Sequence, residues 1–152
     1  TAAALDVVGG VEMDVLPITA NVIKSGFSFQ GGLSVPEIPA QGEADTGVLF
    51  QPAVPGSRVF ALTTHQHHLG TRMQVWYASD TSDLSTPIAD SHSWNDPPLE
   101  LYDPPLDFPA DSSKGFAYEC HWKNPTSQPV YGGLGANDEM CFFWSYFYPA
   151  GG

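Results

Sequence analysis

Apolar and polar positions alternate in short stretches that proline and glycine interrupt every few residues. Fourteen prolines and fifteen glycines lie along the 152 residues, and no window keeps the i, i+3, i+4, i+7 apolar spacing of an amphipathic helix. Between these breaks are short runs rich in β-branched and aromatic residues, a pattern typical of β-strands. We expect strands at Val11 to Ile18, Ala20 to Phe29, Thr46 to Phe50, Arg58 to Thr64, Gln74 to Ala78, Gly115 to Trp122 and Met140 to Tyr148.

These strands predict an all-β fold. Many short strands without helical connections favour an antiparallel β-sandwich or jelly roll over a parallel α/β sheet. The chain is long enough for one domain with its own core, and we find no repeat or dividing linker. The Asp- and Pro-rich stretch from Ser79 to Asp111 is interpreted as an excursion between core strands. We therefore expect a single β-sandwich domain over residues 1–152.

The charge of the chain limits its partners. Seventeen acidic residues against five basic ones give a net charge of −12, which repels nucleic acid and anionic lipid. No apolar stretch is long enough to cross a membrane. Because Thr1 is neither an initiator Met nor the start of a signal-like segment, we expect a processed protein or part of a longer one.

Many of the acidic residues lie in the Ser79 to Asp111 stretch, which suggests a solvated surface. A calcium site is the alternative interpretation, but the regular Asp-x-Asp-x-Asp-Gly spacing of an EF-hand loop is absent. The eight acidic residues concerned are Asp80, Asp83, Asp90, Asp96, Glu100, Asp103, Asp107 and Asp111.

Histidine is concentrated at one point, where an apolar run ends in Thr-Thr-His-Gln-His-His-Leu-Gly. Three of the five histidines lie within residues 65–68. If the strand from Arg58 continues through His67, then His65 and His67 share one face and His68 lies on the other. A His-x-His pair on a strand can chelate one metal ion. The alternative is that these are polar residues of a loop, and a third ligand is needed to decide.

Met140 is the best candidate for the third ligand. It lies at the polar entrance to the aromatic run that leads to Pro149. Two imidazoles with one thioether suit copper, and Cu(I) in particular, better than zinc, calcium or magnesium. Considered alone, Met140 is better interpreted as a residue that fills the core.

The chain has two cysteines, Cys120 and Cys141. An even count in a chain that looks extracytoplasmic suggests one disulfide, which would contribute about 3 kcal/mol by the chain-entropy argument. The alternative is a reduced, buried pair. A disulfide would fix the strand that presents Met140 and predicts a secreted, periplasmic or cell-surface protein.

Several of these residues also carry a family resemblance. His65-Gln-His67-His-Leu-Gly70, then Cys120, then Glu139-Met140-Cys141 resemble the C-terminal half of the ascorbate-dependent type II copper monooxygenases. That group includes dopamine β-monooxygenase and peptidylglycine α-hydroxylating monooxygenase. Tyr131-Gly-Gly-Leu-Gly135 and Phe147-Tyr-Pro149 look closer to the dopamine branch.

The resemblance implies a function and a ligand set. His65, His67 and Met140 would hold one copper ion per chain, and Cys120 would pair with Cys141. Copper at this position would react with O₂ and hydroxylate a C–H bond of a small-molecule substrate.

The resemblance also implies a substrate class, because this chain departs from the peptide branch. Thr63, Phe142 and Trp144 occupy the positions at which that branch holds a substrate carboxylate with Arg, Asn and Tyr. We therefore expect these three residues to line a pocket for an apolar or aromatic substrate.

The family has a second copper, on a preceding domain, which receives electrons from ascorbate. His68, His92 and His121 show no spacing that suggests such a site, and we interpret them as structural or exposed. We therefore expect the isolated chain to be catalytically incomplete and to depend on a second copper domain or another electron donor. The alternative function is an extracytoplasmic copper-binding module, namely a carrier, sensor or adhesion domain without monooxygenase activity.

Overall fold

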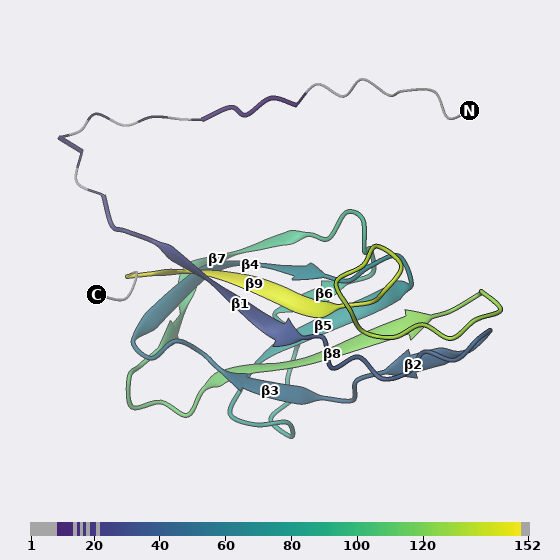
Figure 1. Cartoon of the computed structure of the whole chain (residues 1–152). Coiled ribbons are helices and arrows are strands. Elements are labelled where there is room, and N and C mark those ends of the chain that lie inside the picture. The colour runs from purple at the N-terminus through teal and green to yellow at the C-terminus, as the bar shows by residue number, and fades with distance from the viewer. Residues whose placement is uncertain (1–8, 14, 16, 18, 21, 150–152) are drawn as a thin grey trace.

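The computed structural model describes residues 9–13, 15, 17, 19–20 and 22–149, and all regular structure in them is β (Figure 1). No helix in these ranges is both long and apolar enough to cross a membrane. The strands are β1 (Gly26–Gly32), β2 (Glu43–Asp45), β3 (Leu49–Pro52), β4 (Ser57–His65), β5 (Gly70–Ala78), β6 (Ala89–Ser91), β7 (Leu99–Phe108), β8 (Gly115–Lys123) and β9 (Cys141–Tyr148).

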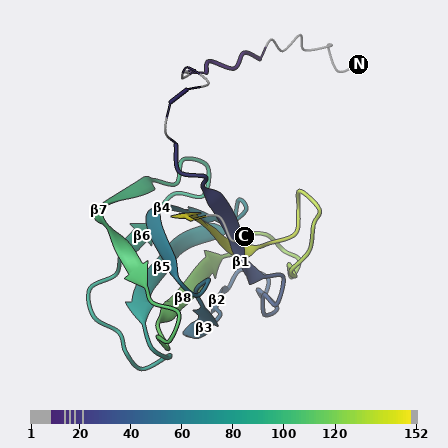
Figure 2. The same ribbon diagram turned by 90° about the vertical axis from the view of Figure 1, so that its left-hand side faces the viewer.

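The strands form two antiparallel sheets that face each other (Figures 1 and 2). One sheet has the order β1-β9-β4-β7, and the other has the order β2-β8-β5-β6 with β3 also paired to β8. This arrangement confirms the predicted all-β sandwich.

Alternation along the strands produces the core between the sheets. On β9, Phe143, Ser145 and Phe147 are buried, while Trp144 and Tyr146 between them are more exposed. On β8, Phe116 and Trp122 are fully or almost fully buried and belong to the same apolar cluster. Phe116 meets Phe143 edge-on, with 5.3 Å between ring centroids. Aromatic side chains from both sheets therefore hold the two layers together.

A disulfide also joins the two sheets. Cys120 of β8 and Cys141 of β9 are bonded, with a Cα–Cα distance of 6.0 Å. Both cysteines are buried. The predicted pairing is confirmed, and the bond lies directly after Met140 at the start of β9.

The predicted strands in the middle and at the end of the chain are confirmed, with shifts of a few residues at their ends. The first two predictions differ from the structure. In the Ala20 to Phe29 stretch the strand begins only at Gly26. In the Val11 to Ile18 stretch residues 14, 16 and 18 lie outside the described residues, and the described ones form no strand. An apolar alternation alone does not make a strand without a paired neighbour.

The sequence predicts no strand within the Ser79 to Asp111 excursion, and this is wrong, because the stretch contains β6 and β7. β7 is an edge strand whose pairing with β4 is irregular: Leu106 lies opposite Val59, but the next pair is Leu101 with Ala61. The residues between Leu101 and Leu106 include Pro104 and Pro105. An edge strand with a bulge tolerates prolines that would break a central strand.

Candidate metal centre

The histidine motif lies in a tight turn after β4. β4 ends at His65, and the N–H of Gly70 donates to the carbonyl of His67 at 3.0 Å. A Cβ on Gly70 would lie 2.6 Å from the Cβ of Gln66, so only glycine fits there. Gln66 is buried and donates to the carbonyl of His121 at 3.0 Å. The condition that the strand continues through His67 is therefore wrong, because this turn ends it.

The turn nevertheless brings two imidazoles together. The rings of His65 and His67 have centroids 5.3 Å apart and are almost perpendicular, at 87°. Both rings are half-buried. At this spacing both side chains can contribute to one site.

One nitrogen of His67 is committed to the backbone. Its Nδ1 lies 2.6 Å from the carbonyl oxygen of Asp138. A carbonyl only accepts hydrogen bonds, so Nδ1 carries the proton and donates it. In the neutral ring the lone pair is then on Nε2, the nitrogen left for a metal ion. The backbone next to Met140 thus fixes the tautomer that a metal ligand needs.

His65 is held in a partly apolar setting. Its ring lies 5.2 Å from that of Trp144, centroid to centroid. Burial, and secondarily the nearby His67, lower the pKa of His65. The imidazole is therefore neutral at neutral pH, the state in which it can coordinate a metal ion.

Met140 lies between two segments that contact the histidines. Phe142, two residues after it, is the cross-strand partner of His65, and Asp138, two residues before it, accepts the hydrogen bond of His67. Figure 1 shows the loop before β9 beside the end of β4. Met140 itself is half-buried. Its backbone is therefore placed next to the pair, as a third ligand requires.

A buried carboxylate fastens these segments to each other. Glu139 is 0% exposed. Its Oε2 accepts from the N–H of His67 and from Nε1 of Trp122, both at 3.0 Å, and its Oε1 accepts from the N–H of Leu69 at 2.8 Å. The side chain that precedes Met140 thus holds the histidine turn in place.

A pocket of about 650 Å³ opens beside the histidine pair. We call it the Trp94 pocket. It is lined by His65, Gln66, His67, His68, Trp94, Asn95, Ala136 and Asn137. His68 is more exposed than the pair and has its Nδ1 3.9 Å from Oε1 of Glu139. His68 was expected on the opposite face, but that expectation depended on a strand through His67.

The residues predicted to form the substrate pocket lie on the outer face of the β1-β9-β4-β7 sheet. Thr63 and Trp144 are cross-strand partners and line a separate hollow of about 430 Å³ with Phe27 and Tyr146. Phe142 does not line it and has its ring 4.5 Å from that of Phe29. We call this hollow the Thr63 hollow.

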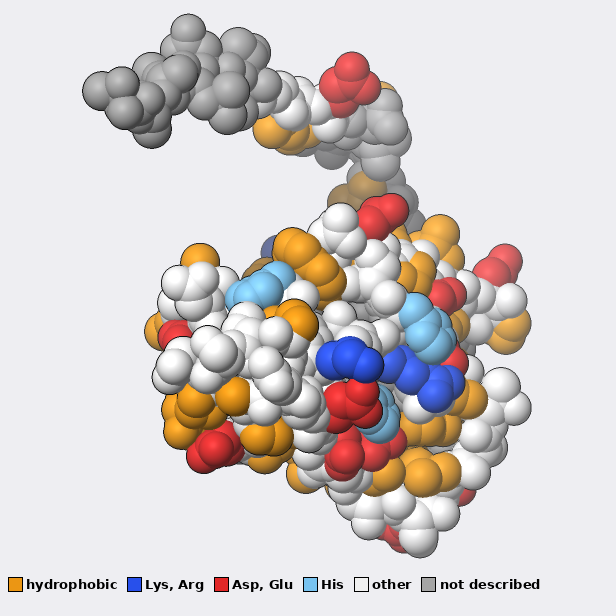
Figure 3. Space-filling model, turned by 90° about the vertical axis from the view of Figure 1, so that its right-hand side faces the viewer, with side chains coloured by type: hydrophobic (Ala, Val, Ile, Leu, Met, Phe, Trp, Pro, Cys, Tyr) orange, Lys and Arg blue, Asp and Glu red, His pale blue; other side chains and the backbone are white. Residues whose placement is uncertain are grey.

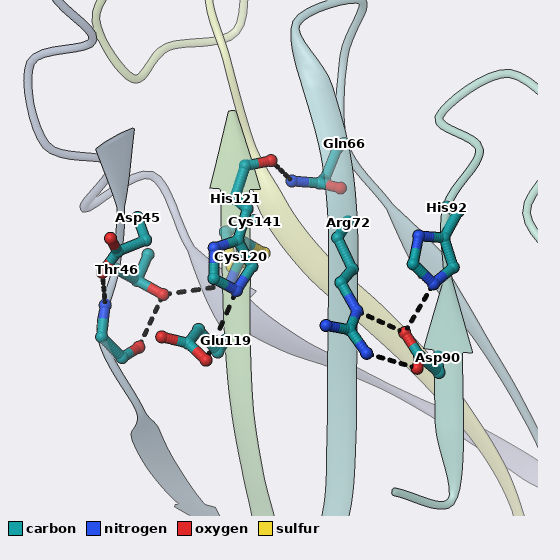
Figure 4. Close-up of polar contacts among 11 residues, drawn as sticks. Asp45, Thr46, Gln66, Arg72, Asp90, His92, Glu119, Cys120, His121 and Cys141 are labelled. Atoms are coloured by element: carbon teal, nitrogen blue, oxygen red, sulfur yellow. Dashed lines mark hydrogen bonds and ion pairs between the residues drawn. A yellow bond between two sulfur atoms is a disulfide. The ribbon is translucent and has the colours of Figure 1, made fainter. Parts of the chain in front are cut away.

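The remaining histidines lie on the outer side of the other sheet and are engaged separately. His92 lies 3.3 Å from Oδ1 of Asp90, and His121, on β8 as expected, lies 3.4 Å from Glu119. Figure 4 shows Arg72 between these two histidines, bound to Asp90 at 2.7 Å. This arginine holds the pKa of Asp90 below its usual value. Figure 3 likewise shows histidines as separate patches, with Lys and Arg side chains between them.

Within the described residues, no three or more His, Cys, Asp or Glu side chains gather where they could hold a metal ion. The acidic stretch therefore gives no support there to the calcium alternative. That finding does not bear on a site with two histidines and a methionine.

Sequence reasoning missed three contributors to this region. The sequence shows Glu139 only as part of the Glu139-Met140-Cys141 motif. The spacing of apolar residues could not show that its carboxylate is buried. The carbonyl of Asp138 has no signal in the sequence, because any residue could supply it. Trp94 lies in the stretch interpreted as an excursion between core strands. A single tryptophan among Asp, Ser and Pro residues is the one feature of the sequence there that could have indicated a binding residue.

Comparison with known proteins supports the family resemblance. The family model described as "Copper type II ascorbate-dependent monooxygenase, C-terminal domain" matches residues 46–151. No curated protein matches the chain. The matched residues include the histidine turn, Met140 and both cysteines, and they cover most of the chain. The chain therefore belongs to the copper type II ascorbate-dependent monooxygenase family, of which it carries the C-terminal domain.

Proposed function

We propose that this chain is the catalytic copper domain of a monooxygenase, and that His65, His67 and Met140 hold one copper ion. The observation that carries the proposal is the 2.6 Å hydrogen bond from Nδ1 of His67 to the carbonyl of Asp138. It prepares Nε2 as a ligand and places the Met140 segment against the histidine turn.

The donor set fits copper. Two imidazoles and a thioether favour Cu(I) over harder ions, because sulfur is a soft ligand. Copper bound there would supply the one-electron chemistry with which the family uses O₂ to hydroxylate a C–H bond. The protein's part is to keep the imidazole of His65 neutral, hold His67 in one tautomer and fix the turn through Glu139.

The number of electrons that the hydroxylation needs indicates that the chain works with an electron-donating partner. Inserting one oxygen atom of O₂ while reducing the other to water takes two external electrons, and one copper ion cycling between Cu(I) and Cu(II) stores one. We therefore propose that a second copper domain or another donor supplies electrons, with ascorbate as the ultimate reductant. The Cys120–Cys141 disulfide fits an oxidising compartment, so we propose an extracytoplasmic location. A copper carrier or sensor built on the same site is the alternative function.

Replacing Met140 with Ile should lower the affinity for Cu(I) by a factor on the order of 100 and affect Cu(II) much less. The reason is that imidazoles remain adequate ligands for the oxidised ion. Competition titrations with a Cu(I) chelator and a Cu(II) chelator measure both affinities. Met13→Ile is the matched control, because Met13 is 78% exposed and far along the chain from the site. Equal losses for the two ions would contradict Met140 as a ligand.

A further inference from the structure

The pocket beside the histidine pair indicates what kind of molecule this chain binds. We propose that the Trp94 pocket is the substrate-binding site and that it takes an uncharged aromatic molecule, stacked on Trp94 and hydrogen-bonded by Asn95 and Asn137. This inference rests on the proposed function only in treating the ligand as a substrate. The site itself is argued from the pocket.

The position of the Trp94 pocket favours it over the Thr63 hollow. His65 and His67 both line the Trp94 pocket, and neither lines the Thr63 hollow. A reacting C–H bond has to lie next to the ligands of the reactive centre. Of the two concavities, the Trp94 pocket meets that condition, although the sequence favoured residues of the Thr63 hollow.

The loop that carries Trp94 holds this residue in place and leaves its side chain partly exposed. The Oγ of Ser91 donates to the carbonyl of Ser93 at 3.1 Å, and the Oγ of Ser93 accepts from the N–H of Asp96 at 3.1 Å. These bonds fix the loop on both sides of Trp94, whose side chain is 44% exposed. An indole held by its backbone and left open on one side offers a preformed stacking surface.

Two side-chain amides supply neutral polar groups at the pocket. The Oγ of Ser93 also donates to Oδ1 of Asn95 at 3.0 Å, which leaves the NH₂ of that amide to donate to a ligand. Asn137, on the loop before Met140, adds a second neutral amide. These groups can recognise a hydroxyl or carbonyl on an aromatic ligand without a formal charge.

The side chains that line the Trp94 pocket favour an uncharged ligand. The described residues around the pocket include no Asp, Glu, Lys or Arg, although the chain carries 17 acidic residues. A carboxylate ligand would meet no Lys or Arg side chain there, and an ammonium ligand would meet no carboxylate. Either would lose hydration without a paired side-chain charge. An uncharged ligand avoids that cost.

The test compares three molecules that share a phenyl ring: 2-phenylethanol, phenylacetate and 2-phenylethylamine. Each is titrated into the ¹⁵N-labelled full chain and followed by NMR. We expect 2-phenylethanol to bind most tightly and to shift the indole N–H of Trp94 and the side-chain amides of Asn95 and Asn137. Trp94→Ala should weaken its binding about tenfold, because stacking and burial of the ring are lost, and Trp94→Phe should retain most of the affinity.

The matched control is Phe27→Ala, which removes an exposed aromatic ring from the Thr63 hollow and should change the affinity less than about twofold. The proposal is overturned if 2-phenylethanol does not bind up to its solubility limit, if a charged analogue binds as tightly, or if Phe27→Ala has the larger effect. Copper titration of the same samples separates the two proposals. Failure to bind copper with the Trp94 shifts intact would contradict the proposed function and leave the pocket standing.

Discussion

Replacing Glu139 with Ala should destabilise the fold by about 3–5 kcal/mol, because a buried carboxylate that accepts three hydrogen bonds is lost. The N–H groups of His67 and Leu69 and the indole N–H of Trp122 would be left without that acceptor. Urea denaturation at neutral pH measures the change in free energy of unfolding. Such a loss is a large part of the roughly 5–15 kcal/mol that stabilises a domain.

Two further variants sharpen this prediction. Glu139→Gln keeps the shape and one acceptor oxygen, so we expect a smaller loss of about 2–3 kcal/mol. Glu43→Ala is the matched control, because Glu43 is 70% exposed in its ion pair with Lys123 and should cost less than about 1 kcal/mol. If Glu139→Ala costs no more than Glu43→Ala, the role assigned to this carboxylate is wrong.

Removing the disulfide, in a Cys120→Ala and Cys141→Ala double variant, should cost about 3 kcal/mol. The two cysteines are 21 residues apart, and opening a loop of that length restores this much entropy to the unfolded chain at room temperature. Because Cys141 directly follows Met140, we also expect weaker Cu(I) binding. Unfolding with and without a thiol reductant measures the first effect, and chelator competition measures the second.

The double variant also serves as the control for effects of the reductant that do not involve the disulfide. Reductant should destabilise the natural sequence and leave the double variant unchanged. Two free thiols by mass spectrometry, in protein purified without reductant, would contradict both the pairing and the inference of an oxidising compartment.

The parts of the fold that the sequence predicted are those in which local pattern and tertiary pairing agree. β8 and β9 are recognisable because both are unusually rich in aromatic and apolar residues, as central strands are. β7 is not, because its prolines and exposed leucines make sense only at a sheet edge. β2 and β6, with three residues each, are too short to give any periodic signal.

In the candidate site, too, some residues could be predicted from the sequence and others could not. His65, His67 and Met140 could be named from residue type, order and family resemblance. The contacts that prepare them could not, because they depend on a backbone carbonyl at Asp138 and a buried side chain at Glu139. Neither the position of a carbonyl nor the burial of a charge follows from a pattern of neighbouring residues. The pocket at Trp94 depends on a loop whose course sequence periodicity does not describe.

X-ray absorption spectroscopy of the chain loaded with one equivalent of Cu(I) tests the central claim most directly. We expect one sulfur and two imidazole scatterers around copper, with the sulfur lost in Met140→Ile and retained in Met13→Ile. A Cu(I) site without a sulfur scatterer, or one that keeps its sulfur when Met140 is replaced, would contradict the assignment of His65, His67 and Met140 as the copper ligands.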